Sequence, residues 1–343
     1  MLERPRQAGG VKWLCFATSL SALSCRWSRR EVLTMASQFF KKLMLFGSKH
    51  RVKLLAVSCG GLFATNVFCH VFPQRTYGKL YQAWSKGVPA ELPDRLQDTF
   101  QEVLKDAGVE SAQNYTAFAA FSFQPVSAGV PWLPSGALIG IPVNFNSTGE
   151  DGQGITNRIV MINGRDIKWD SEVGKSLRES LTFSSDAQKF AIAREVMYLQ
   201  SNGPVLQSVV APACLAGTYM TALAVKQALG LYSGPFLLRA FFNLAAAATG
   251  FVGYFLLSDA VNHWFDYRSD HQTATISKRY AKGGIEFYDK ILARNRTFRS
   301  LLGKMGMEMY ATNGNLFPKH WFRLKHAPYT ARKEMLENTL KDC

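Results

Sequence analysis

Three long apolar runs constrain the fold of this chain more than any other feature of its sequence. One lies in the first quarter of the chain, and two lie close together after its middle. A helix needs about 20 predominantly apolar residues to cross the hydrocarbon core of a bilayer, and each run comes close to that length. We therefore expect an integral membrane protein, with membrane-spanning helices over residues 52–73, 204–226 and 235–257.

The second and third runs are joined by a short polar link that contains Lys226 and Arg239. Helices this close in sequence must form a hairpin, so the segments before and after it face the same compartment. Loops on the inner side of a membrane carry an excess of Lys and Arg. If the membrane is the mitochondrial inner membrane, the basic N-terminus and the link lie in the matrix. Residues 74–203 and 258–343 are then expected in the intermembrane space.

Positive charge is concentrated at the two ends of the chain. There are 40 Lys and Arg against 25 Asp and Glu, a net charge of +15. Residues 1–53 hold eleven basic residues and two acids, residues 54–257 hold fourteen of each, and residues 258–343 hold fifteen and nine. A nucleic-acid-binding protein would concentrate Lys and Arg on its folded core. The neutral middle argues against nucleic acid as a partner and for basic ends that act in targeting and orientation.

The first 51 residues are rich in Arg, Lys and Ser and nearly free of acids, which is typical of a mitochondrial presequence. A secretory signal would need an uncharged apolar stretch, and none precedes Arg26 cleanly. We therefore predict a basic leader over residues 1–51 and a location in the mitochondrial inner membrane. Met35 is an alternative start, because the stretch after it is also basic and aromatic; residues 1–34 are then an extension.

The sequence between the first two spans predicts a folded α+β domain, residues 74–203. Apolar residues at helical spacing predict a helix over residues 94–106, with Gly108 as its stop. Asn163-Gly164 is a strong hairpin signal. The basic tail, residues 258–343, is expected to be helical and to pack on this domain. Further strands are predicted over residues 115–124, 137–145, 158–162 and 165–169. Helices are predicted over residues 172–181 and from a cap at Ser185 to about Gln200.

The helix predicted over residues 185–200 invites comparison with the zinc-peptidase helix that carries His-Glu-x-x-His. In that motif two His at i and i+4 bind the metal and the Glu activates water. The corresponding residues here are Arg194, Glu195 and Tyr198, so both metal-binding His are replaced. The plain alternative is that Glu195 is a solvated helix residue.

The order of elements after this helix also fits a membrane metallopeptidase. Two spans follow, and then a helix predicted from Asp266 to Ile291, with Asp270 and His271 near the place of a third ligand. We therefore consider a degenerate metallopeptidase-like frame that has lost its metal site. Helix, hairpin and helix also occur in this order by chance.

The six cysteines give no disulfide or zinc framework, because they form no C-x-x-C pair. Cys59, Cys69 and Cys214 fall inside the apolar runs, where a free Cys usually behaves as a small hydrophobic residue. Their thiols leave a copper-handling module as an alternative function.

Several stretches resemble the mitochondrial transmembrane protein 177 family from about Met35 to the C-terminus; residues 1–34 fall outside the resemblance. The resemblance implies an inner-membrane protein that associates with assembly factors of cytochrome c oxidase. It also implies support of newly made subunit two while its copper site is completed. The family supplies no catalytic residues. The matching stretches are FSFQPVSAGVPWLPSGALIGIP (121–142), AQKFAIAREVMYL (187–199), APACLAGTYM (211–220), GGIEFYDKIL (283–292), RSLLGK (299–304) and RLKHAPYT (323–330).

These observations together predict a non-enzymatic assembly or stability factor with no cofactor and no metal. Its expected partners are cytochrome c oxidase subunit two, the assembly factors of that subunit, including copper-delivery factors, and inner-membrane lipid. A membrane metallopeptidase and a copper-handling module are the alternatives.

Overall fold

The computed structural model describes residues 38–39, 41–42, 45–85, 87–146, 161–162, 164–318, 320 and 323–342. The described residues divide into two units after Val57. The predictions for residues 1–34 and for a start at Met35 lie outside the described residues.

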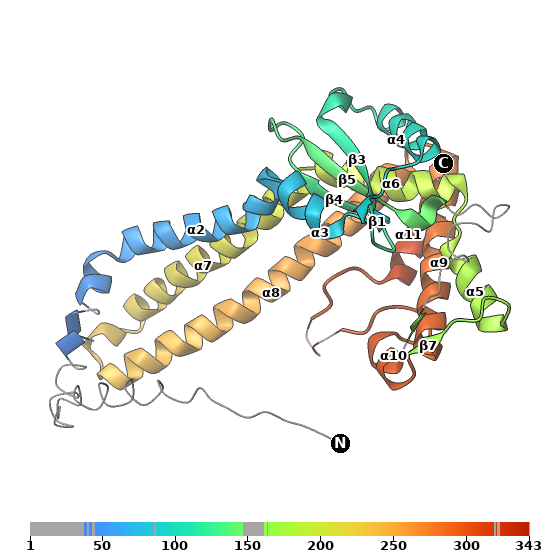
Figure 1. Ribbon diagram of the computed structural model, residues 1–343. Helices are drawn as coiled ribbons and strands as arrows, with labels where there is room; N and C mark the ends of the chain where they lie inside the picture. The colour runs from blue at the N-terminus through green and yellow to red at the C-terminus, as the bar shows by residue number, and fades with distance from the viewer. Residues whose placement is uncertain are drawn as a thin grey trace, which may run out of the picture. The chain divides into compact units, whose positions relative to one another are not determined.

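Three described helices are long and apolar enough to cross a membrane. They are α2 (Arg51–Val71), α7 (Gly203–Ala228) and α8 (Phe236–Ala274), and they correspond to the three predicted spans (Figure 1). The 39 residues of α8 continue well beyond Leu257, where its apolar part ends. The C-terminal part of α8 therefore carries polar residues away from the apolar stretch.

The hairpin predicted for the second and third spans is present. α7 and α8 lie side by side (Figure 1). A Cβ atom on Gly250 of α8 would lie 2.4 Å from Oγ1 of Thr218 of α7, so this close approach requires glycine. The link begins at Gly230, whose φ of 61° suits glycine, and continues through the 3-10 turn η4 (Leu231–Ser233).

The single helix predicted from Asp266 to Ile291 is wrong. α8 ends at Ala274, and α9 (Lys278–Leu301) begins after Ser277, whose extended backbone interrupts the helical path. Asp266 and Asp270 therefore belong to α8, whereas Ile291 belongs to α9.

A three-stranded sheet has the order β3-β5-β4. β3 (Tyr115–Ala120) pairs parallel to β5 (Ala137–Pro142), and β4 (Val126–Gly129) pairs antiparallel to β5. β3 and β5 are shorter than predicted, and β4 lies between the two predicted strands 115–124 and 137–145, where no strand was predicted. The 3-10 turn η3 (Val143–Asn146) follows β5 directly.

The predicted Asn-Gly hairpin is formed by β6 (Met161–Ile162) and β7 (Arg165–Asp166), on either side of residues 163–164. Helices α4 (Asp94–Asp106) and α5 (Glu172–Leu181) have the predicted bounds. Helix α6 (Ser185–Gln200) begins one residue earlier than predicted, because its N-cap is Ser184 and not Ser185. The other described elements are η1 (Gln74–Gly78), α3 (Lys79–Tyr81), β1 (Trp84–Ser85), β2 (Val88–Pro89), η2 (Ala112–Asn114), α10 (Lys304–Met309) and α11 (Tyr329–Asp342).

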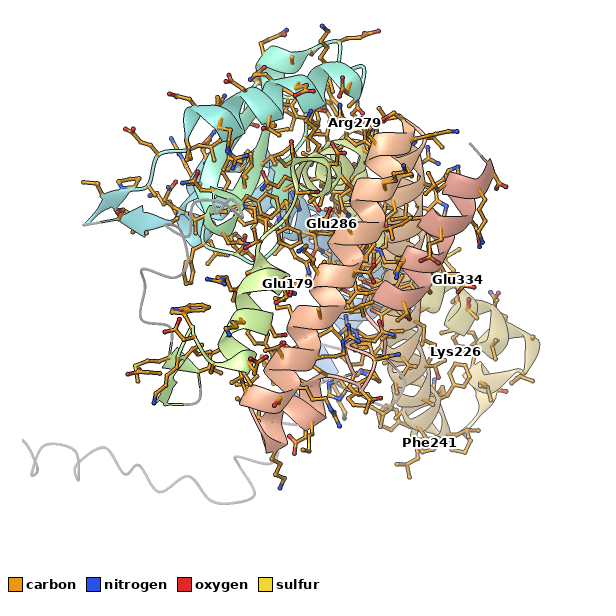
Figure 2. All side chains as sticks on the ribbon, turned by 90° about the vertical axis from the view of Figure 1, so that its right-hand side faces the viewer. Glu179, Lys226, Phe241, Arg279, Glu286 and Glu334 are labelled. Atoms are coloured by element: carbon orange, nitrogen blue, oxygen red, sulfur yellow. The ribbon has the colours of Figure 1, made fainter. Side chains whose placement is uncertain are left out.

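Helix α6 is the centre of the core. It packs on the sheet and against α4, α8 and α9, and α11 packs against α8 and α9. Figure 2 shows α9 between α5, which carries Glu179, and α11, which carries Glu334. Phe190 and Ile192 of α6 and Ile139 of β5 are fully buried in one apolar cluster. This packing fixes the polar residues that α6 directs toward α8.

Candidate functional site

The side chain of Arg194 on α6 meets three carboxylates. Its Nη1 donates to Oε1 of Glu195 at 3.0 Å, its Nη2 to Oδ1 of Asp266 at 3.3 Å, and its Nε to Oδ1 of Asp270 at 3.2 Å. Asp266 and Asp270 are one helical turn apart on α8, so both face the same neighbour. The start of α6 is fixed by Ser184, whose hydroxyl accepts from the N–H of Ala187.

A second arginine closes the network from the other side. Arg332 of α11 donates from Nε to Oδ2 of Asp270 at 2.6 Å, and its Nη1 forms an ion pair with Asp266, 3.1 Å from Oδ1. The hydroxyl of Tyr288 on α9 donates to both carboxylate oxygens of Asp270 at 2.8 and 2.9 Å. Four helices therefore meet at two aspartates.

The charges in this network stabilise one another. Burial by itself would raise the pKa of Asp266, but the charge of Arg332, a hydrogen bond from His326 and the charge of Arg194 hold that pKa below its ordinary value of 3.8. Burial is the largest cause that raises the pKa of Tyr288, and the charge of Asp270 adds to it. Asp266 is therefore a carboxylate and Tyr288 a neutral donor at neutral pH.

The network contains three of the five residues singled out from the sequence. Arg194 lies in contact with Glu195 and with Asp270. Tyr198 lies at its margin, where its ring packs edge-on against Phe265 at 5.3 Å between centroids. His271 is exposed and lies near Thr339 of α11, with 3.5 Å between Nδ1 and Oγ1.

Sequence reasoning missed the other members of the network. Asp266 stands four residues before Asp270, and this i, i+4 acidic pair after an apolar run is a signal that was available. Arg332 and Tyr288 come from distant helices, and no local pattern connects them to Asp270.

A cavity of about 500 Å³ lies beside the network. Its walls come from η1, from the segment before β4 and β4 itself, from α6 and α8, and from α11 with the residue His326 that precedes it. Ser127 of β4 donates its hydroxyl to Oε2 of Glu195 at 2.6 Å, which joins the edge of the sheet to α6. The cavity is therefore bounded by charged groups that are already paired.

The donor set does not suit a metal ion. A guanidinium has five N–H donors and no lone pair to offer, so Arg194 cannot replace a ligating His. Among the described residues, no three or more His, Cys, Asp or Glu are grouped to hold a metal. Cys59 is one of the cysteines considered for copper, and its thiol lies 3.6 Å from the carbonyl oxygen of Pro212 on α7. The likeness to a peptidase frame stays a prediction from helix order.

The sequence model described as Transmembrane protein 177 matches residues 136–318. A Xenopus laevis protein of that name is 54% identical over 306 residues, which cover 89% of this chain and 99% of the relative. The chain belongs to the transmembrane protein 177 family. The Danio rerio member is 53% identical over 308 residues, 90% of this chain and 99% of its own. The Homo sapiens member is 48% identical over 289 residues, which cover 84% of this chain and 92% of the relative. No solved structure matches the chain.

The match to the transmembrane protein 177 family confirms the resemblance drawn from short stretches of sequence. It also agrees with the three helices that are long enough to cross a membrane. The matched residues include α6 and α8, and so four of the network's charged side chains, Arg194, Glu195, Asp266 and Asp270.

Proposed function

We propose that this chain is a non-enzymatic factor of the mitochondrial inner membrane that supports the stability and assembly of newly made cytochrome c oxidase subunit two. Membership of the transmembrane protein 177 family and three apolar helices support a role within a membrane. The observation that carries the non-enzymatic part is the contact of the Arg194 guanidinium with both Asp266 and Asp270.

The non-enzymatic part rests on the fact that the carboxylates that catalysis would need already accept hydrogen bonds within the fold. A general base must reach the proton that it removes, and a metal site needs free lone pairs. Both oxygens of Asp270 accept hydrogen bonds from arginine, and each oxygen of Glu195 has a partner. The network then acts as a rigid frame that holds α6, α8 and α11 together around the cavity.

The proposed partners are subunit two and the assembly factors that act on it, including copper-delivery factors. Lipid of the inner membrane surrounds the apolar parts of α2, α7 and α8, and nucleic acid is not a partner. The soluble parts are proposed to face the intermembrane space. A C-terminal tag should then resist protease in intact mitochondria and be digested once the outer membrane is opened.

The proposed function is tested by deleting the protein and labelling newly made mitochondrial proteins in a pulse and chase. Subunit two should be synthesised normally and then decay faster than in the parent cells, before other respiratory complexes decline. Re-expression of the wild-type chain should restore its half-life. Equal decay of all mitochondrially made subunits would point to a general membrane or translation role instead.

The two alternatives from the sequence have a direct test. Protein purified in detergent is assayed for zinc and copper by mass spectrometry of the metals. A metallopeptidase or a copper-handling module should retain about one ion per chain, whereas the proposed factor should retain neither.

A further inference from the structure

The strand β4 has one free edge. In the order β3-β5-β4 it stands last, and it pairs only with β5 among the described strands. A free edge presents main-chain N–H and C=O groups that another strand can pair with. The free edge of β4 borders the cavity, because Val126 and Ser127 line it.

The register shows which groups point to the cavity. The N–H of Val130 donates to the carbonyl of Gly136 across the pair at 3.1 Å, whereas the N–H of Gly129 turns away and donates to Nδ1 of His70 at 3.3 Å. Orientation alternates along an antiparallel strand, so Ser127 has the same orientation as Gly129. The main-chain N–H and C=O of Ser127 therefore point away from β5.

The two neighbouring positions of this edge are closed. Pro125 has no N–H to donate, and the N–H of Gly129 is taken by His70. Proline and covered edge groups are common protection against unwanted strand pairing. The open position at Ser127 lies between the two protected ones, beside a cavity.

The cavity wall contains a second sign of a missing partner. Ser269 of α8 is 2% exposed, and its hydroxyl has no hydrogen-bond partner within the described residues. It lines the same cavity as Ser127, with Asn262 and the apolar ring of Phe265 nearby. A buried polar group without a partner is costly, so a ligand or water that reaches Ser269 gains a hydrogen bond.

We propose that this groove binds an extended, uncharged segment of another polypeptide. One residue of the segment pairs with the main chain of Ser127, and a neighbouring side chain enters the cavity toward Ser269. Strand addition of this kind takes affinity from main-chain hydrogen bonds and selectivity from the side-chain pocket. The segment is uncharged because the charged side chains that line the cavity balance, with Arg194 and Arg332 against Glu195 and Asp266. The inference goes beyond the proposed function, since it does not depend on which protein supplies the segment.

The test uses the full chain in lipid nanodiscs and a random heptapeptide library displayed on phage, with empty nanodiscs to remove lipid binders. Peptides enriched on the wild type are measured on Ser127→Pro and Ser127→Ala. The proline removes the outward N–H and spares the inward hydrogen bonds of β4, whereas the alanine removes only the hydroxyl. We expect Ser127→Ala to bind within about twofold of the wild type and Ser127→Pro to bind about tenfold more weakly.

A second variant leaves the strand intact. Asn262→Trp fills the cavity from α8, and Asn338→Trp is the same substitution on an exposed part of α11 away from the cavity. Asn262→Trp should lose peptide binding at least tenfold while Asn338→Trp keeps it, with thermal unfolding used to show that both are folded. The proposal is overturned if no peptide is enriched over empty nanodiscs, or if enriched peptides bind Ser127→Pro or Asn262→Trp as well as the wild type.

Discussion

Arg332 of α11 holds Asp270 of α8 through two parallel hydrogen bonds, from Nε to Oδ2 at 2.6 Å and from Nη2 to Oδ1 at 2.8 Å. The side chain of Asp270 is fully buried and that of Arg332 is 3% exposed. A planar guanidinium matches a carboxylate in this side-by-side geometry, which fixes direction as well as distance. The pair therefore anchors the C-terminal helix to the helix that leaves the apolar region.

Replacing Arg332 with Met should destabilise the fold strongly, because it leaves buried carboxylates with one arginine instead of two. Breaking a buried pair from one side commonly costs about 3–5 kcal/mol. Lys333→Met is the matched control, since its pair with Asp289 is partly exposed and worth roughly 1 kcal/mol or less. Unfolding in detergent with increasing denaturant measures both. A loss in Arg332→Met no larger than in Lys333→Met would contradict the assigned role of the pair.

Replacing Arg294 of α9 with Met should stabilise the fold, in contrast to the replacement of Arg332. Arg294 is 6% exposed, its Nε and Nη1 have no hydrogen-bond partner among the described residues, and the ring of Phe123 lies 5.2 Å from its guanidinium carbon. Burial lowers the pKa of Arg294. Because a buried charge without a carboxylate is costly, Arg294→Met should raise the free energy of unfolding by about 1 kcal/mol or more.

The control for Arg294 is Arg299→Met on the same helix. Arg299 donates to the carbonyl oxygens of Met307 and Tyr310, so its loss should lower stability by about 1–3 kcal/mol. The midpoints of thermal unfolding compare the two variants. Equal destabilisation would mean that Arg294 has a partner that satisfies its charge.

The stability of the fold should fall in acid, in part through Asp266. Its pKa in the folded chain is lower than the ordinary 3.8, because the charges of Arg332 and Arg194 outweigh burial. The folded state therefore binds fewer protons than the unfolded state, and the stabilisation is present above 3.8 and is lost as the pH falls below it. Unfolding measured from about pH 7 to pH 3 should show a smaller acid loss for Asp266→Asn than for the wild type. Glu308→Gln, an exposed acid on α10, should keep the wild-type loss.

Local sequence patterns predicted the helices of the domain well, because capping and apolar spacing act within a few residues. The bounds of α4 follow from such signals, whereas the cap of α6 is Ser184 and not the neighbouring Ser185 that the pattern indicated. They could not predict β4, since four residues of Val-Ser-Ala-Gly become a strand only by pairing with β5. They also could not predict the partner of Asp270, because Arg332 is 62 positions away and only tertiary packing brings the two together.

The interpretation of Arg194 and Glu195 changed for a physical reason. The sequence placed them in the frame of a lost metal site, with Arg194 at the position of a metal-binding His and Glu195 at the position of the Glu that activates water. In the fold their partners are Asp266, Asp270 and Ser127, so they join helices and a strand. The chemistry of these two residues therefore follows from their contacts and not from their positions in a motif.

A substitution of Glu195 distinguishes a scaffold from an enzyme most directly. A catalytic base at this position would lose orders of magnitude in rate as an amide, because the amide cannot take up the proton. A scaffold needs only the shape and hydrogen bonding of the side chain. In Glu195→Gln the amide oxygen still accepts from Ser127, and Arg194 keeps Asp266 and Asp270.

We therefore expect Glu195→Gln to restore the half-life of newly made subunit two in deleted cells as fully as the wild type does. Ala193→Pro is the structural counterpart, because Ala193 is fully buried in the middle of α6 and proline there costs about 3 kcal/mol or more. It should not accumulate and should not rescue. If Glu195→Gln accumulates to the wild-type level and still fails to rescue, the side chain has a chemical role and the non-enzymatic proposal is wrong.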